Sequence, residues 1–306
     1  MYEKLVVVTR KTRLEDLVAR FNTRAQAKFY VEHAGGDFSD YEREEEAYRR
    51  SLDTLRRSLD PGLKVQFVDR GFLATFLFTE KDLVLTLGQD GLVANTAKYV
   101  GSQPVVGVNP DPERFDGVLL PFRPEQARAA VECVLAGKAR VREVTMAEAL
   151  LNDGQRLLAF NDLFIGARSH VSARYRIALK ETSEPHSSSG VLVSTGAGST
   201  GWLSSVFSMA AGVAAFTGGR SGGPLQLPWE DPRLVFVVRE PFTSKSSRAG
   251  LVAGILEPGV ELLLESLMPT GGVIFSDGIE ADYLAFNSGA IARVRASQQR
   301  ARLVVG

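Results

Sequence analysis

One aspartate, Asp90, lies between two glycines in the stretch LVLTLGQDGLVANTAKYV at residues 83–100. Residues 83–87 form a short apolar run, which is typical of a strand buried on both faces of a parallel sheet, and the residues after Gly91 read as a helix. A strand, a tight turn and a helix bring free backbone N–H groups and the positive helix end to one small volume that suits phosphate. We therefore expect Gly88 and Gly91 to border a phosphate-binding site.

The carboxylate of Asp90 needs a chemical reason to lie beside a site for anions, because it repels them. One reason is to take a proton from a hydroxyl group. The other is to cap the helix, since Asp is among the preferred N-cap residues. The local sequence leaves both roles open.

A second glycine-rich stretch, SSSGVLVSTGAGSTGW, occupies residues 187–202. A short strand at residues 191–193 runs into a turn of Gly, Ser, Thr and Ala, and a helix follows. Small residues let a ligand touch the backbone, whereas the alternative is a flexible loop. The strand before the turn and the capping residue at its end favour binding.

Two adjacent polar residues, Asn161 and Asp162, interrupt the apolar run LLAFNDLFIG. A polar group in a buried strand needs a hydrogen-bond partner. A nucleobase with its ribose would supply such partners, and an internal hydrogen bond would do so equally well.

The elements that position these residues follow two different patterns. Before residue 137, strand-like runs at 5–8, 65–68, 83–87 and 104–109 alternate with helical spacing at 14–33, 40–59, 92–99 and 124–137. This alternation predicts an open parallel sheet, with the glycine turn and Asn109 at the carboxyl ends of its strands, where ligands collect.

After residue 137 the pattern changes to short strands with few helices between them. The runs are at 139–144, 157–165, 175–179, 191–195, 234–238, 251–255, 260–264, 273–275, 283–286 and 291–294, with a helix at 199–216 and a surface loop at 218–228. The sequence therefore predicts an α/β domain at residues 1–137 and a β-rich domain at residues 138–306.

Composition limits the classes of function. The 306 residues are 44% hydrophobic and 24% charged, and 36 basic residues balance 36 acidic ones, so no nucleic acid or anionic membrane is expected as a partner. Cys133 alone cannot form an internal disulfide, and the scattered His33, His170 and His186 predict no metal site. The start MYEKLVVVTR lacks a signal-peptide pattern and no stretch is long enough to cross a membrane, so we expect a cytoplasmic protein.

These motifs, in this order, resemble the NAD kinase family, which shares a GGDGT motif with diacylglycerol and sphingosine kinases. GQDGL at 88–92 is similar to GGDGT, AFNDLFIG at 159–166 to the family's Asn-Glu strand, and STGAGSTGW at 194–202 to its STPTGSTAY-type loop. The mitochondrial-type branch and its bacterial relatives are most similar, through VVGVNPDPERFDG at 105–117, SSG at 188–190, VREPFTSKSSR at 238–248 and FNSGAIARV at 286–294. The resemblance spans roughly residues 83–297.

The resemblance implies an enzyme that phosphorylates the 2′-hydroxyl of the adenosine ribose of NAD, with ATP and Mg²⁺ as the donor and NADP as the product. It implies a β-sandwich-like second domain, NAD bound between the two domains, and a homodimer assembled through the β-rich domain. Asp90 would be the catalytic base.

The resemblance also implies which residues bind NAD. Asn161 and Asp162 match the Asn-Glu pair that recognises adenosine, and Ser189 matches a position near the nicotinamide ribose. Thr195, Ser199 and Thr200 lie on the nucleotide loop.

The glycine turn departs from the family at two positions. Gln89 replaces a glycine and Leu92 replaces a threonine, which removes one close backbone approach and one hydroxyl. Two other functions therefore stay open: a catalytically weak NAD(P)-binding regulator, and a lipid kinase of the same superfamily. A lipid kinase would lack the Asn161-Asp162 pair and the STGAGST loop. The choice between ATP and polyphosphate, and between NAD and NADH, is open at this level.

Overall fold

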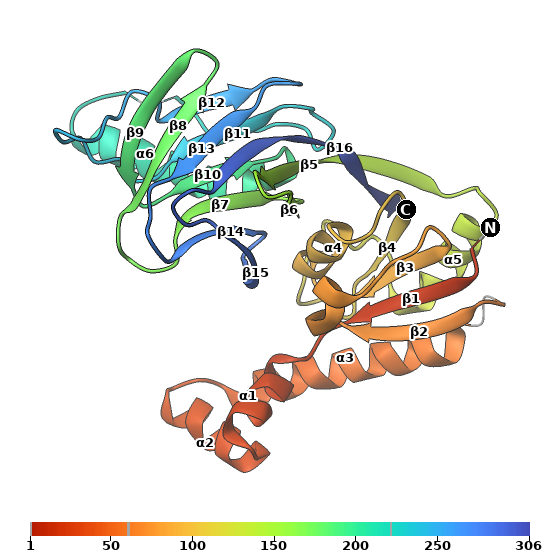
Figure 1. The fold of residues 1–306 in the computed structure, drawn as a ribbon. Coiled ribbons are helices and arrows are strands. Elements are labelled where there is room, and N and C mark those ends of the chain that lie inside the picture. Colours follow the sequence, from red (N-terminus) through yellow and green to blue (C-terminus); the bar gives the residue numbers. More distant parts are fainter. Residues whose placement is uncertain (1, 60–61, 221) are drawn as a thin grey trace. The chain divides into compact units, whose positions relative to one another are not determined.

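The computed structural model describes residues 2–59, 62–220 and 222–306. The chain divides into two compact units (Figure 1). The first contains the residues up to Arg142 together with Arg302–Gly306, and the second contains Glu143–Ala301. No helix among the described residues is both long and apolar enough to cross a membrane.

The first unit is built on a parallel sheet with the strand order β2-β1-β3-β4. These strands are β1 (Lys4–Thr9), β2 (Lys64–Asp69), β3 (Asp82–Leu87) and β4 (Pro104–Val108). Every residue of β3 and β4 is buried, as expected for parallel strands covered on both faces. Beyond β4, Arg302 and Leu303 of β16 (Ile291–Val305) add a short parallel pairing. The prediction of an open parallel α/β sheet is confirmed.

Helices α3 (Phe38–Ser58) and α5 (Ala127–Leu135) pack on this sheet through residues that include Tyr48, Leu55 and Val131. The long α3 was predicted from its narrow apolar stripe, and its exposed face carries acids four residues before arginines, as in the Glu46–Arg50 ion pair.

The predicted helix over residues 14–33 is wrong, because the chain turns in the middle of it. It forms α1 (Arg13–Phe21) and α2 (Arg24–His33), which lie at the start of α3 (Figure 1). Asn22 between them is left-handed, with φ 65°, and the Thr23 hydroxyl caps α2 by accepting the Gln26 N–H at 3.1 Å.

The second unit is a β-sandwich, which confirms the predicted β-rich domain. One sheet has the order β9-β8-β13-β16 with β5 and β6 joined at β16, and the other, called the β7 sheet here, has the order β12-β11-β10-β7-β14-β15. The bounds are β5 (Arg140–Leu151), β6 (Arg156–Ala159), β7 (Asp162–Ala167), β8 (Ala173–Leu179), β9 (Thr182–Ser188), β10 (Val191–Ser194), β11 (Leu234–Val238), β12 (Ala253–Leu256), β13 (Leu262–Ser266), β14 (Gly272–Ser276) and β15 (Ile279–Ala285). Both sheets contribute to one core, which includes Leu163, Tyr175 and Phe236.

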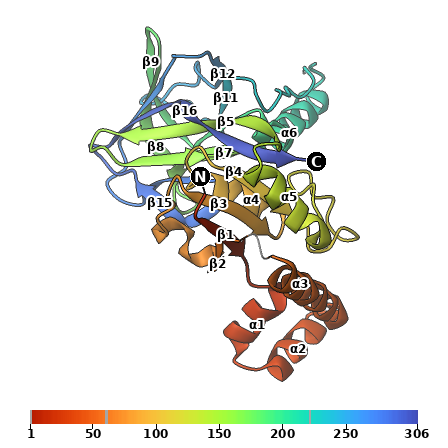
Figure 2. The ribbon, with the colours of Figure 1, turned by 90° about the vertical axis from the view of Figure 1, so that its right-hand side faces the viewer.

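Helix α6 (Trp202–Phe216) covers part of the outer face of the β7 sheet (Figure 2). It packs against Leu192 and Val235, which alternate along their strands with residues that face the core. The described residues of the predicted loop at 218–228 form no helix or strand, and Ser221 lies outside the described residues.

Several strands differ from the prediction, among them β5, which continues to Leu151 although the prediction ended at residue 144. β9 was missed because its sequence TSEPHSS is polar and contains a proline, which an edge strand tolerates. β16 continues far beyond the predicted residues 291–294. The strand expected at 157–165 is two strands, β6 and β7, with a bend at Phe160 and Asn161 between them.

Candidate functional site

The glycine turn of the first unit connects β3 directly to α4 (Asp90–Ala97), as predicted. Gln89 occupies the N-cap position, and its side chain makes no capping hydrogen bond. The first N–H groups of a helix have no partner within the helix. Without a side-chain cap, the start of α4 keeps donors that an anion can use.

Asp90 is half-buried at the first position of α4, and its carboxylate is not the cap of that helix. Oδ1 accepts the backbone N–H of Leu119 at 2.6 Å, from a loop 29 positions later. Within the described part of the chain, Oδ2 has no hydrogen-bond partner. One oxygen therefore orients the carboxylate, and the other can accept a proton.

Two glycines bring the Leu119 loop to Asp90. A Cβ on Gly107 of β4 would lie 2.2 Å from the Leu119 carbonyl oxygen, so only glycine lets the loop approach. Gly117 has φ 64°, the left-handed conformation that favours glycine. Asn109 is adjacent to the turn at the carboxyl end of β4, as predicted, but its buried side chain bonds the Phe115 carbonyl and the Asp111 N–H.

Leu92, which replaces the threonine of the GGDGT motif, affects the packing of the turn. Leu92 is buried, and its Cδ2 would lie 2.7 Å from a Cβ on Gly88, so the leucine fills the space beside that glycine. Gly91 is exposed, with nothing within 4 Å of an added Cβ. The turn is therefore open to a ligand at Gly91 on its exposed side, whereas Leu92 fills the space beside Gly88 on its buried side.

A buried arginine lies behind the turn. The Cδ atom of Arg10 is 3.6 Å from the Cβ position of Gly88, and its Nη2 donates to Glu44 Oε1 at 2.9 Å. The Tyr48 hydroxyl accepts the Arg10 N–H at 2.9 Å and donates to the Leu87 carbonyl at 3.2 Å. Burial raises the pKa of Tyr48 to about 12, so this phenol stays a neutral donor. These bonds fix the start of the turn to α3.

In the second unit, the bend between β6 and β7 frees Asn161 and Asp162 from the alternation of a regular strand. Three successive N–H groups, of Phe160, Asn161 and Asp162, donate to the carboxylate of Asp277 at 3.0, 2.6 and 3.2 Å. Asn161 is partly exposed, whereas Asp162 is buried. The local sequence gave no sign of Asp277.

Burial raises the pKa of Asp162 to about 7, the nearby charge of Asp277 adds to this increase, and a hydrogen bond with Ser194 opposes it. Oδ1 of Asp162 is buried and has no hydrogen-bond partner among the described residues. Such an acceptor is unfavourable unless a donor reaches it.

The loop after β10 uses its hydroxyls internally. Thr195 Oγ1 donates to the Phe160 carbonyl at 2.6 Å and accepts the Gly198 N–H at 3.2 Å. Ser199 Oγ donates to the Gly196 carbonyl at 2.7 Å and accepts the Leu227 N–H at 3.3 Å. Thr200 is exposed.

The glycines of this loop allow close contact between chain segments. A Cβ added to Gly198 would lie 2.3 Å from the Asn161 carbonyl oxygen. A Cβ added to Gly196 would lie 1.9 Å from the Pro228 carbonyl oxygen. The loop is thus packed against the bend and is not a free linker.

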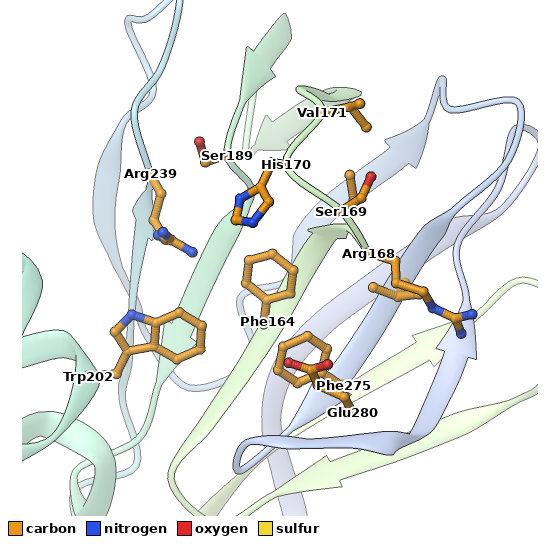
Figure 3. Close-up of a pocket in the computed structure, with 12 residues that line it drawn as sticks. Phe164, Arg168, Ser169, His170, Val171, Ser189, Trp202, Arg239, Phe275 and Glu280 are labelled. Carbon is orange, nitrogen blue, oxygen red and sulfur yellow. The ribbon is translucent and has the colours of Figure 1, made fainter. Parts of the chain in front are cut away.

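A pocket of about 370 Å³ opens on the outer face of the β7 sheet (Figure 3). Phe164 stacks on Trp202 with ring centroids 5.8 Å apart and on Phe275 at 4.9 Å, and the guanidinium of Arg239 lies 5.4 Å from the Trp202 ring. Ser189 lies at the same pocket (Figure 3). The volume, the flat apolar walls and the cation suit an aromatic heterocycle attached to an anionic or polar group.

Glycines also shape this pocket. The Phe164 ring covers Gly166 and Gly190, where an added Cβ would lie 2.7 and 2.8 Å from ring atoms. Gly190 has φ 108°, so no other residue fits both its backbone and its neighbour. The SSG segment seen in the sequence therefore packs against the Phe164 ring through Gly190 and lines the pocket through Ser189.

The predicted site residues thus form two groups. The first unit brings Gly88, Asp90 and Gly91 together. The second unit joins Asn161, Asp162 and Thr195 through the bend, with Ser199 and Thr200 further along the loop and Ser189 at the pocket. Sequence reasoning did not single out Phe164, Trp202, Arg239 or Asp277. No three His, Cys, Asp or Glu side chains gather as a metal site in the described ranges.

Curated proteins with similar sequences are nucleotide kinases. The NAD kinase of Chlorobium phaeobacteroides strain BS1 is 31% identical over 159 residues, which cover 50% of this chain and 54% of that protein. The probable NADH kinase of Oryza sativa subsp. japonica is 26% identical over 218 residues, covering 63% and 62%. This chain spans about half the length of the bacterial relatives it matches. No protein-family model matches it.

Solved structures share the fold. Yeast NADH kinase complexed with NADH superposes with a TM-score of 0.57 at 17% identity, covering 100% of this chain and 84% of that one. An NAD kinase from Archaeoglobus fulgidus in complex with ATP gives 0.55 at 16% identity, covering 98% and 93%. A parallel α/β unit followed by a β-sandwich is thus an arrangement that this chain has in common with both.

Proposed function

We propose that this chain, a member of the NAD kinase family, phosphorylates NAD at the 2′-hydroxyl of its adenosine ribose to give NADP, with MgATP as the donor. The observation that carries the proposal is the carboxylate of Asp90. It lies in a glycine turn at an uncapped helix start, is oriented by the Leu119 N–H, and keeps one oxygen free.

In this proposal Asp90 accepts the proton of the ribose hydroxyl as the hydroxyl oxygen attacks the γ-phosphorus of ATP, the bond from that phosphorus to the β–γ bridging oxygen breaks, and ADP leaves. The hydrogen bond from Leu119 fixes the direction of the carboxylate and leaves its other oxygen to take the proton. The proton leaves the hydroxyl only as the O–P bond forms.

The phosphates would lie along the turn from Gly88 to Gly91, where the uncapped start of α4 offers its first backbone N–H groups as donors. The N–H of Gly88 itself already donates to the Val108 carbonyl at 3.3 Å. Mg²⁺ would arrive with ATP as part of that substrate, offsetting the charge of the phosphates.

NAD would be held by the second unit. Asn161 and the buried, unpartnered oxygen of Asp162 suit the donors and acceptors of adenosine. The aromatic pocket beside Ser189 suits the nicotinamide end. Thr200 is exposed and able to contact the nucleotide, while Thr195 and Ser199 would act through the shape of the loop, because their hydroxyls are already bonded.

A catalytically weak NAD(P)-binding regulator is the second candidate. The buried side chain of Leu92 favours it, since this residue fills space beside Gly88 where the family has a hydroxyl. A lipid kinase would use neither the Asn161-Asp162 bend nor the aromatic pocket. We also propose that the chain is cytoplasmic. We propose that it forms a homodimer, because the resemblance implies assembly through the β-rich domain, where outer strands such as β12 can pair with another chain.

The test is an activity assay with purified protein, NAD and MgATP, in which NADP is measured with a dehydrogenase specific for NADP. The proposal expects NADP to form in proportion to protein, and Asp90→Asn to reduce the rate without removing NAD binding. Tight NAD binding with no NADP would favour the regulator, and phosphorylation of diacylglycerol or sphingosine in place of NAD would favour the lipid kinase.

A further inference from the structure

Asp277 lies in the turn between β14 and β15, 115 positions after Asp162, and it has a left-handed backbone with φ 54°. Its Oδ1 accepts the N–H groups of Asn161 and Asp162, and its Oδ2 accepts that of Phe160. Its own N–H donates to the Asp162 carbonyl at 2.9 Å. One aspartate thus holds four backbone groups of the bend.

Thr195 holds the remaining two. Its N–H donates to the Asn161 carbonyl at 2.9 Å and its hydroxyl to the Phe160 carbonyl at 2.6 Å. Every backbone N–H and C=O of Phe160, Asn161 and Asp162 is therefore bonded by Asp277 or Thr195. The irregular backbone of the bend is defined by these two residues, because no strand ladder or helix defines Phe160 and Asn161.

The charge of Asp277 has an electrostatic cost, even though its hydrogen bonds stabilise the bend. Its negative charge adds to the increase that burial produces in the pKa of Asp162. An Asp-Gly pair such as Asp277-Gly278 would make a hairpin turn without reaching the bend. A second carboxylate close to a buried first one indicates a role in arranging the bend.

We propose that Asp277 is a positioning residue for dinucleotide recognition, which aims Asn161 and Asp162 at one ligand by holding the backbone between them. On a regular strand the two side chains would point to opposite faces, so one ligand could meet only one of them. Asp162 already presents a buried Oδ1 that lacks a donor, which a ribose hydroxyl or a base amino group can supply. The inference rests on the proposed binding of NAD by the second unit.

The test uses the full-length protein and two substitutions that suit a positive φ. Asp277→Gly removes the carboxylate, and Asp277→Asn keeps one acceptor oxygen and replaces the other by a donor that repels the N–H of Phe160. We expect the dissociation constant for NAD, measured by calorimetric titration, to rise about tenfold or more with Asp277→Gly and less with Asp277→Asn. The KM for MgATP should stay within about twofold.

Asp153→Asn is the matched control. Asp153 is an exposed aspartate of the same unit whose Oδ1 accepts a backbone N–H, that of Gln155, at 2.9 Å. It makes the same type of turn bond away from the bend, so its substitution should leave NAD affinity unchanged. A double-mutant cycle of Asp277→Asn with Asp162→Asn should be non-additive in NAD affinity, because one residue acts through the other.

The outcomes distinguish a failure of the proposed function from a failure of the positioning role of Asp277. If the unmodified protein does not bind NAD, the proposed function fails and this inference fails with it. If the protein binds NAD and Asp277→Gly lowers the melting temperature but keeps the NAD affinity, Asp277 only stabilises the turn and the positioning role is overturned. Asp277→Asn exchanges one atom and keeps the left-handed turn, so it decides the question where Asp277→Gly does not fold.

Discussion

Asp162 should make the stability of this protein depend on pH in a direction opposite to that of ordinary surface carboxylates. Burial, with the charge of Asp277, raises the pKa of Asp162 to about 7 in the folded state, from an ordinary 3.8. Between these two values the folded protein binds more protons than the unfolded chain. The stabilising effect of this group is therefore complete below about pH 4 and is lost as the pH rises through about 7.

The magnitude follows from the shift. A difference of about 3 pKa units corresponds to roughly 4 kcal/mol of unfolding free energy at 1.36 kcal/mol per unit. Part of this stabilisation is already lost at pH 5, so the contribution of Asp162 to the unfolding free energy falls by roughly 2–3 kcal/mol between pH 5 and pH 8. Asp40 and Asp231 have pKa values lowered mainly by hydrogen bonds from arginines, so they titrate below this window and do not mask the effect.

Asp162→Asn keeps the shape of the side chain and removes the titration. We expect the difference in unfolding free energy between the variant and the unmodified protein to change with pH. Measured by urea denaturation, it should shift in favour of the variant by roughly 2–3 kcal/mol from pH 5 to pH 8. Asp153→Asn, at an exposed position, should show no such change. A difference between variant and unmodified protein that is the same at both pH values would show that Asp162 is ionised throughout, and would refute the reasoning.

Three further predictions concern the first unit and assembly. Asp90→Asn should lower turnover by about 10² or more while changing NAD affinity less, and steady-state kinetics showing near-normal turnover would remove Asp90 as the base. Gly107→Ala should destabilise the protein by about 2 kcal/mol or more in urea melts and lower turnover, because the alanine Cβ displaces the Leu119 loop. Gly91→Ala is the control for stability, because the space around Gly91 is open. Light scattering at micromolar concentration should give the mass of a dimer or larger assembly, and a monomer mass would contradict the proposed homodimer.

Most of the fold follows from local patterns. The parallel strands β1, β3 and β4 are continuous apolar runs because both faces are buried, so the sequence identifies them without tertiary information. The break between α1 and α2 could have been found in Asn22-Thr23, a left-handed residue followed by a cap. Strand β9 could not, because its polar residues are tolerated only by virtue of its position at the edge of a sheet.

The candidate site also has a part that the sequence predicts and a part that it does not. The glycine turn is predictable because Gly88, Asp90 and Gly91 are neighbours in the chain. The pocket is not, because Phe164, Trp202 and Arg239 meet only through the register of the β7 sheet and the packing of α6. Asp277 acts across 115 positions, and the Asp-Gly pair at residues 277–278 signals a turn without saying what the carboxylate reaches.

The pairing of β4 with the last strand has a consequence for biosynthesis. Arg302 pairs with Pro104, and its side chain donates to the Ser102 carbonyl at 2.8 Å across 200 positions of sequence. A ribosome adding about 5–20 residues per second would leave the apolar β4 edge without this neighbour for roughly 10–40 s. During that interval the unpaired edge of β4 can pair with strands of other chains. The sheet that carries the glycine turn is thus completed by residues that follow the whole second unit in the chain.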